Sequence, residues 1–118
     1  MAHFYKFEDM EVWKEGRKLS RAIRQICGRE RVKRDFAFVD QITRAARSVM
    51  TNIAEGSDAM TIPEFIQFLG YAKRSAVEVR SHLYDAIDEK YIIQQEFNDL
   101  TTHALRSSAA ARTQAPYS

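Results

Sequence analysis

Cysteine, proline and glycine are scarce in this chain of 118 residues, and each scarcity excludes a class of structure. The single cysteine, Cys27, cannot form an internal disulfide, which excludes a disulfide-stapled secreted domain and fits a cytoplasmic setting. Two prolines and four glycines provide few turns, so long helices are favoured. No apolar run approaches the roughly 20 residues that span a bilayer. The first residues lack the charged-then-apolar pattern of a secretory signal.

Catalytic and metal-binding patterns are also missing. His3, His82 and His103 lie far apart in the sequence, and none belongs to a His-Glu-x-x-His motif. A metal ion needs convergent ligands, and His82 with Glu78 supplies only two. Cys27 has no histidine near it in sequence to activate it as a nucleophile. We therefore expect a protein that is not an enzyme and that uses no metal and no cofactor.

The composition is that of an ordinary folded domain. Hydrophobic residues make up 45% of the chain and charged residues 29%. The length predicts one domain, which we place at residues 1–111. Residues 112–118 show no periodicity and are predicted to fray as a C-terminal tail.

Apolar residues recur every three or four positions in four stretches, and no stretch alternates as a strand does. The predicted helices cover roughly residues 10–27, 35–55, 61–90 and 95–111. Asp9 is the predicted N-cap of the first helix. Thr61-Ile62-Pro63-Glu64 is a capping box with proline in the first turn. We predict an all-α fold, an antiparallel up-down-up-down four-helix bundle.

Three motifs resemble those of a known family. Asn52-Ile53-Ala54-Glu55-Gly56, preceded by Asp40-Gln41-Ile42-Thr43-Arg44-Ala45-Ala46, resembles the signature of the 23S rRNA intervening-sequence proteins. Phe7-Glu8-Asp9-Met10-Glu11-Val12-Trp13 and Glu64-Phe65-Ile66-Gln67-Phe68-Leu69 are similar to the starts of that family's first and third helices. The resemblance covers roughly residues 4–93. Met50 departs from it where proline is common, Arg74 where a small residue is common, and the fourth helix is short.

The resemblance implies a non-enzymatic four-helix bundle. It also implies that copies of the chain assemble into a ring, a pentamer, and that the protein acts with nucleic acid. A more distant relative in the same fold group is the accessory protein of diversity-generating retroelements, which partners a reverse transcriptase. The resemblance therefore allows a protein partner as well as RNA or DNA.

Polar residues form an edge beside the apolar face of the second helix, and Gly56 is predicted to turn left-handed and close that helix. The edge comprises Gln41, Ser48, Asn52 and Glu55. A matching edge on the third helix comprises Tyr71, Ser75, Glu78 and His82. We predict that the two edges meet at a packing seam, with Arg44 or Arg74 pairing with Glu55 or Glu78.

Positive charge is concentrated in the first half of the chain. Residues 1–50 hold 12 Lys and Arg against 7 Asp and Glu, whereas residues 51–118 hold 6 against 9. The candidate phosphate-binding residues follow the outer face of the first helix, the loop after it and the second helix; they are Lys14, Arg17, Lys18, Arg21, Arg24, Arg29, Arg31, Lys33, Arg34 and Arg47.

Two interpretations of this basic face remain open. It is either an ordinary solvated surface or a surface that binds nucleic acid through phosphate contacts of low sequence specificity. A second function class is an adaptor or assembly module whose basic face meets an acidic protein. Ile66, Val77 and Tyr84 lie about 100° around the third helix from its core stripe, which predicts either a wide core or an interface with another copy.

Overall fold

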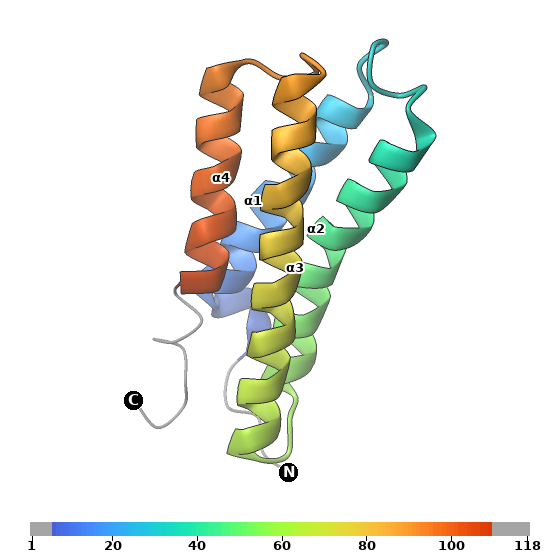
Figure 1. The fold of residues 1–118 in the computed structure, drawn as a ribbon. Helices are drawn as coiled ribbons and strands as arrows, with labels where there is room; N and C mark the ends of the chain where they lie inside the picture. Colours follow the sequence, from blue (N-terminus) through green and yellow to red (C-terminus); the bar gives the residue numbers. More distant parts are fainter. Residues whose placement is uncertain (1–5, 110–118) are drawn as a thin grey trace.

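The computed structural model describes residues 6–109, and helices make up most of this part of the chain (Figure 1). A short 3-10 helix, η1, spans Phe7–Asp9. The four main helices are α1 (Glu11–Cys27), α2 (Phe36–Ser57), α3 (Ile62–Asp88) and α4 (Gln94–Ala109). Residues 6–109 contain no β-strand. The predicted all-α four-helix bundle is confirmed.

Successive helices run in opposite directions, as Figure 1 shows. Ser48 of α2 meets Ser75 of α3, and farther down the same two helices Gly56 meets Phe68. α1 packs against α2 and α4, and α3 packs against the same two helices, so α1 and α3 are diagonal in the bundle. A surface on the outer side of α1 therefore faces away from α3.

The core consists of two clusters of buried apolar side chains. One fills the end of the bundle near the α1–α2 loop and is built around residues such as Leu19, Ile23 and Leu83. The other fills the opposite end and includes Phe65, which is fully buried. The apolar periodicity of the sequence accounts for both clusters, because residues three or four apart face the same side of a helix.

The start of α1 differs from the prediction. Asp9 is not the N-cap, because it lies in η1, where its N–H donates to the carbonyl oxygen of Lys6 at 3.0 Å. Met10 occupies the N-cap position without any side-chain cap hydrogen bond, and only 1% of its surface is exposed. Burial of Met10 in the core beside Val12 thus decides where α1 begins, in place of a capping carboxylate.

Gly56 does not close α2 in a left-handed conformation, contrary to the prediction. α2 continues through Ser57, and no glycine in residues 6–109 has a positive φ. A Cβ atom added at Gly56 would lie 3.0 Å from Cβ of Phe68 and 3.5 Å from Cδ1 of Phe65. The glycine is therefore required because α2 and α3 approach each other closely at this point.

α3 begins at the predicted N-cap, Thr61, and its C-terminal end is followed by a residue in the left-handed conformation. The Glu64 N–H donates to Oγ1 of the N-cap residue Thr61 at 3.2 Å, which is one bond of the predicted capping box. Oε1 of Glu64 accepts at 3.0 Å from the N–H of Met60 and not from that of Thr61. At the other end Lys90 adopts a left-handed φ of 61°, and the Tyr91 N–H donates to the Ala86 carbonyl oxygen at 2.9 Å.

α4 buries only a narrow face. Leu100 and Ala104 are buried, but Leu105 is 42% exposed, and Ser107 takes its place on the inner side. The Ser107 hydroxyl donates to the Ala104 carbonyl oxygen at 2.8 Å, so its burial leaves no unpaired hydroxyl.

The predicted frayed tail, residues 112–118, lies outside the described residues. No helix within residues 6–109 is long and apolar enough to cross a membrane.

Candidate nucleic-acid interface

The outer face of α1 carries five exposed cations, which fall into two groups by their contacts. Lys14 and Lys18 form ion pairs one turn away, with Glu11 at 3.4 Å and with Glu15 at 3.3 Å. The other three, Arg17, Arg21 and Arg24, have no acidic partner within residues 6–109. These three arginines are therefore the cations of α1 that are available for a phosphate.

The basic loop between α1 and α2 is largely engaged inside the molecule. Arg29 donates to the Tyr91 carbonyl oxygen at 2.9 Å and to both carboxylate oxygens of Glu96, one of them at 3.2 Å. Arg31 donates to the Lys90 carbonyl oxygen at 3.2 Å. These contacts tie the α1–α2 loop to the α3–α4 turn, so Arg29 and Arg31 hold the bundle end together.

The remaining loop cations differ from each other. Lys33 pairs with Glu30 at 2.8 Å, an exposed pair of small energetic weight. Arg34 is exposed, as is Arg47 on α2, and neither has an acidic partner within the described part of the chain. Of the ten predicted phosphate ligands, five are thus exposed and have neither a carboxylate partner nor a side-chain hydrogen bond inside the described part of the chain; they are Arg17, Arg21, Arg24, Arg34 and Arg47.

α1 and α2 lie close together where the basic residues of the two helices meet. A Cβ atom at Gly16 would lie 3.2 Å from Cγ1 of Val49 and 3.4 Å from Cγ of Met50. Arg47 precedes Met50 by one turn and so lies on the α1 side of α2. The unpaired arginines of α1 and Arg47 of α2 therefore belong to one outer surface, which we call the α1/α2 face.

An aromatic residue at this face was missed in the sequence analysis. Phe36, the first residue of α2, is 79% exposed, whereas Phe38 is buried in the core. The sequence signal was present, because Phe36 directly follows the basic loop and lies outside the apolar arc that begins at Phe38.

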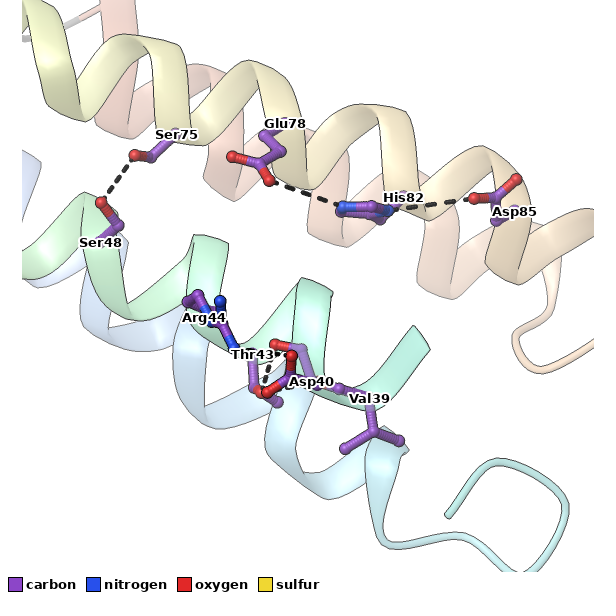
Figure 2. A network of polar contacts seen from close by, with 9 residues as sticks. All are labelled: Val39, Asp40, Thr43, Arg44, Ser48, Ser75, Glu78, His82 and Asp85. Atoms are coloured by element: carbon purple, nitrogen blue, oxygen red, sulfur yellow. Dashed lines mark hydrogen bonds and ion pairs between the residues drawn. The ribbon is translucent and has the colours of Figure 1, made fainter. Parts of the chain in front are cut away.

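The predicted polar seam between α2 and α3 forms in part (Figure 2). The Ser75 hydroxyl donates to Oγ of Ser48 at 2.8 Å, and the Asn52 amide donates to both oxygens of Ser48 at 2.9 Å. Ser75 is buried and the other two are half-buried. These three residues satisfy one another's hydrogen bonds, which makes them structural.

The arginine pairing predicted across the seam does not form. Arg44 instead pairs with Asp40 one turn away on α2 at 2.7 Å, as Figure 2 shows. Arg74 lies over the ring of Tyr71 on its own helix, with its Cζ 5.8 Å from the ring centroid. Oε2 of Glu78 lies 3.9 Å from Nε2 of His82 on the same helix. Residues one turn apart on one helix meet at a lower entropic cost than residues on facing helices.

The two remaining residues of the predicted seam are exposed. Gln41 lies beside His82, Asp85 and Asp35 at a cleft of about 250 Å³ near the start of α2. Glu55 lies at a second cleft of about 770 Å³ between η1, the end of α2 and the start of α3. The 770 Å³ cleft has carboxylates and apolar side chains on its walls but no histidine or cysteine.

One partly buried charged pair joins α1 to α4. Nδ1 of His103 lies 2.8 Å from Oε1 of Glu15, and only 12% of the Glu15 side chain is exposed. Burial raises the pKa of Glu15, but hydrogen bonds from His103 and Lys18 outweigh it and hold that pKa below its ordinary value. Glu15 therefore remains ionised, and its charge offsets part of the charge on Lys18.

Groups that could hold a metal ion are absent from residues 6–109. Glu78 approaches Nε2 of His82 and Asp85 approaches Nδ1, each at 3.9 Å, so the two carboxylates lie at opposite ring nitrogens and do not converge on one metal ion. Cys27 is buried, and this burial raises the pKa of its thiol, so the thiol is an inert core group. His3 lies outside the described residues.

Ile66, Val77 and Tyr84 of α3 are not part of a wide core. They are 41%, 50% and 61% exposed, and together they form an apolar strip, which we call the α3 strip. The Tyr84 ring meets the Phe97 ring of α4 edge-on at 5.0 Å, so the strip borders the α3–α4 seam. Of the two interpretations that the sequence left open, the wide core is excluded.

Comparison with known proteins identifies the fold and the family. The family model described as 23S rRNA-intervening sequence protein matches residues 8–111. The chain belongs to this family. No curated protein sequence matches the chain. The assignment confirms the resemblance carried by the motif Asn52-Ile53-Ala54-Glu55-Gly56 and by the starts of the first and third helices.

A solved structure of another protein has the same fold. It is described as a protein with unknown function from the S23 ribosomal protein family of Bacteroides thetaiotaomicron. The two structures superpose with a TM-score of 0.78 at 21% sequence identity, over 86% of this chain and 95% of the other. At this identity the likeness supports the fold.

Proposed function

We propose that this protein binds nucleic acid, RNA or DNA, through the α1/α2 face, without catalysing a reaction and with low sequence specificity. The observation that supports the proposal is the set of exposed arginines without carboxylate partners on this face. Folding gains little from unpaired surface arginines, whereas phosphates attract them and release counterions on binding. Membership of a family named for an rRNA intervening sequence agrees with a nucleic-acid ligand.

The test is a salt titration of binding, measured by fluorescence anisotropy with labelled oligonucleotides. We expect the logarithm of the affinity to fall with the logarithm of the salt concentration, with a slope of at least about −3. Because the expected contacts go to phosphate, sequence changes in the oligonucleotide should alter the affinity little. An affinity that stays constant between low and moderate salt would refute the electrostatic basis of the proposal.

A charge-reversal experiment locates the surface. The double variant Arg17→Glu, Arg21→Glu should abolish binding and leave the fold intact, because both side chains are exposed. The double variant Lys73→Glu, Arg74→Glu is the matched control, since it changes the net charge by the same amount at two exposed residues of α3, diagonal to α1 in the bundle. Equal losses for this control and for Arg17→Glu, Arg21→Glu would show that only net charge matters.

We also propose that copies of the chain assemble through the α3 strip, into a pentamer as the family resemblance implies. Apolar residues that remain exposed along one side of a helix of a small folded chain favour a protein contact. Assembly would multiply the α1/α2 faces and so convert weak single contacts into useful avidity. Light scattering should show an oligomer, and Val77→Glu should dissociate it, while Met60→Glu, at an exposed residue outside the strip, should not. A wild-type monomer would contradict this part of the proposal.

The same apolar strip favours the alternative function, that of an adaptor for another protein such as a nucleic-acid enzyme. In the first function α3 contacts another copy of the chain, and in the alternative it contacts a different protein. The two functions differ in whether nucleic acid or the protein contact holds the partner. A partner that remains bound after nuclease treatment, and that Val77→Glu releases, would favour the adaptor. A partner lost with the nucleic acid would favour direct nucleic-acid binding.

A further inference from the structure

Phe36 is the most exposed of the large apolar side chains in the described part of the chain, at 79%. It begins α2 directly after Arg34 and the N-cap residue Asp35. The aromatic ring contributes almost nothing to the core, since the nearby Phe38 fills that role. A side chain of this size kept in water beside cations is therefore a candidate for a ligand contact.

The position of Phe36 on α2 places it on the α1/α2 face. Phe36, Thr43, Arg47 and Met50 are spaced by seven, four and three residues, which puts them on one stripe of the helix. Met50 lies against α1, where a Cβ atom at Gly16 would be 3.4 Å from its Cγ. Phe36 and Arg47 therefore flank the same side of the α1–α2 contact.

The opposite flank of this contact, on α1, carries a second aromatic residue. Trp13, Arg17 and Arg24 lie on the stripe of α1 that borders α2, because they are spaced by four and seven residues. The Arg17 guanidinium carbon lies 5.8 Å from the centroid of the Trp13 ring, a cation–π contact. The face thus has an aromatic ring at each end and arginines between them.

The distance between the two rings sets the size of a ligand. With Gly16 opposite Met50, the antiparallel register places Trp13 and Phe36 about 25 Å apart along the helix axes, at 1.5 Å per residue. A stacked strand rises about 3.4 Å per nucleotide, so about seven nucleotides would cover the face. Asp40 also lies on the α2 stripe, but Arg44 binds its carboxylate at 2.7 Å and offsets its charge.

We infer that the α1/α2 face binds single-stranded nucleic acid in preference to duplex, with an unpaired base stacked on Phe36 and phosphates on Arg17, Arg24 and Arg47. This inference rests on the proposed function and narrows its ligand. An aromatic ring can stack on the face of an unpaired base, whereas the bases of a duplex already stack on each other. The arginines alone would not distinguish the two forms of ligand.

The experiment compares binding of a ten-nucleotide labelled single strand and of a ten-base-pair labelled duplex, each made as RNA and as DNA. We expect the wild type to prefer the single strand. Phe36→Leu should weaken single-strand binding on the order of tenfold and leave duplex binding unchanged, and Phe36→Tyr should retain the wild-type affinity. Because Trp13 is the only tryptophan, quenching of its fluorescence reports directly on occupation of the face.

Tyr71→Leu is the matched control. Tyr71 is an exposed ring with an arginine over it, as Trp13 also has, but it lies on α3. This variant should bind the single strand as the wild type does. A comparison of the RNA and DNA probes shows whether the sugar contributes.

Three outcomes would overturn the inference. If Phe36→Leu binds the single strand as tightly as the wild type while Arg17→Glu, Arg21→Glu does not, base stacking is refuted and the proposed function remains. If wild-type protein binds neither probe, the proposed function fails and the inference fails with it. If Phe36→Leu changes the oligomeric state seen by light scattering, the ring is a contact between copies.

Discussion

Gly56 and Gly70 offer a direct test of the packing between α2 and α3, because the same substitution should have opposite effects at the two positions. Both glycines lie inside helices, where alanine is more favourable by about 1 kcal/mol. At Gly70 nothing lies within 4 Å of an added Cβ atom. Gly70→Ala should therefore raise the free energy of unfolding by about 0.5–1 kcal/mol.

At Gly56 the added methyl group meets a rigid neighbour. The new Cβ would lie 3.0 Å from Cβ of Phe68, an atom attached to the α3 backbone, and 3.5 Å from the Phe65 carbonyl oxygen. Relief of this contact requires α3 to move, and overpacking of this kind costs about 1–3 kcal/mol. After the gain in helix propensity, Gly56→Ala should lower the free energy of unfolding by about 1 kcal/mol.

The measurement is urea unfolding of both variants and the wild type at one low protein concentration, followed by circular dichroism. The two variants should differ by roughly 2 kcal/mol with unchanged m-values. In thermal unfolding each kcal/mol corresponds to a shift of about 4 °C for a domain of this size. If Gly56→Ala proves as stable as Gly70→Ala, α2 and α3 do not approach closely at Gly56, and the account of this motif is refuted.

Two further predictions concern the contacts at the α3–α4 turn. Hydrogen bonds from Arg29 and from the Ile93 N–H hold the pKa of Glu96 below its ordinary value of 4.5. These bonds therefore stabilise the folded state fully above pH 4.5, and the stabilisation disappears as the pH falls through the lowered pKa. Glu96→Gln should therefore lower the free energy of unfolding by about 1 kcal/mol near pH 7 and by little in acid. Urea unfolding at both pH values measures this difference. An equal loss of stability at the two pH values would contradict the prediction. Lys90 has a φ of 61°, which glycine adopts without strain, so Lys90→Gly should raise the free energy of unfolding by up to about 1 kcal/mol. The midpoint of thermal unfolding should rise accordingly. A lower midpoint would show that the contribution of the lysine side chain outweighs this strain.

The predictions that succeeded depend on neighbours in the sequence. The N-cap bond from the Glu64 N–H to the Thr61 side chain joins residues three apart, and the structure has this bond. The core periodicity is also local, and it predicted buried residues such as Leu19 and Phe65. These features form because the pattern of a single helix already places the residues on one face.

The predictions that failed depend on which elements become neighbours in space. The role of Gly56 depends on Phe68 of α3, which no pattern within α2 contains. The phosphate contacts of Arg29 and Arg31 stay a prediction, but the α3–α4 turn approaches both residues and supplies carbonyl oxygens and Glu96 as partners. Their engagement leaves the arginines of α1, Arg34 and Arg47 as the candidates for the proposed phosphate contacts.

The sequence by itself determined four amphipathic helices, their order, the signature motif of the family and the excess of positive charge in its first half. Only the tertiary structure decided which cations are already paired, that Phe36 lies in solvent beside the free ones, and that the α3 strip is uncovered. The physical reason is that helix formation depends on contacts between residues three or four apart in the sequence. The pairing of charged side chains and the exposure of apolar ones depend on residues from different helices.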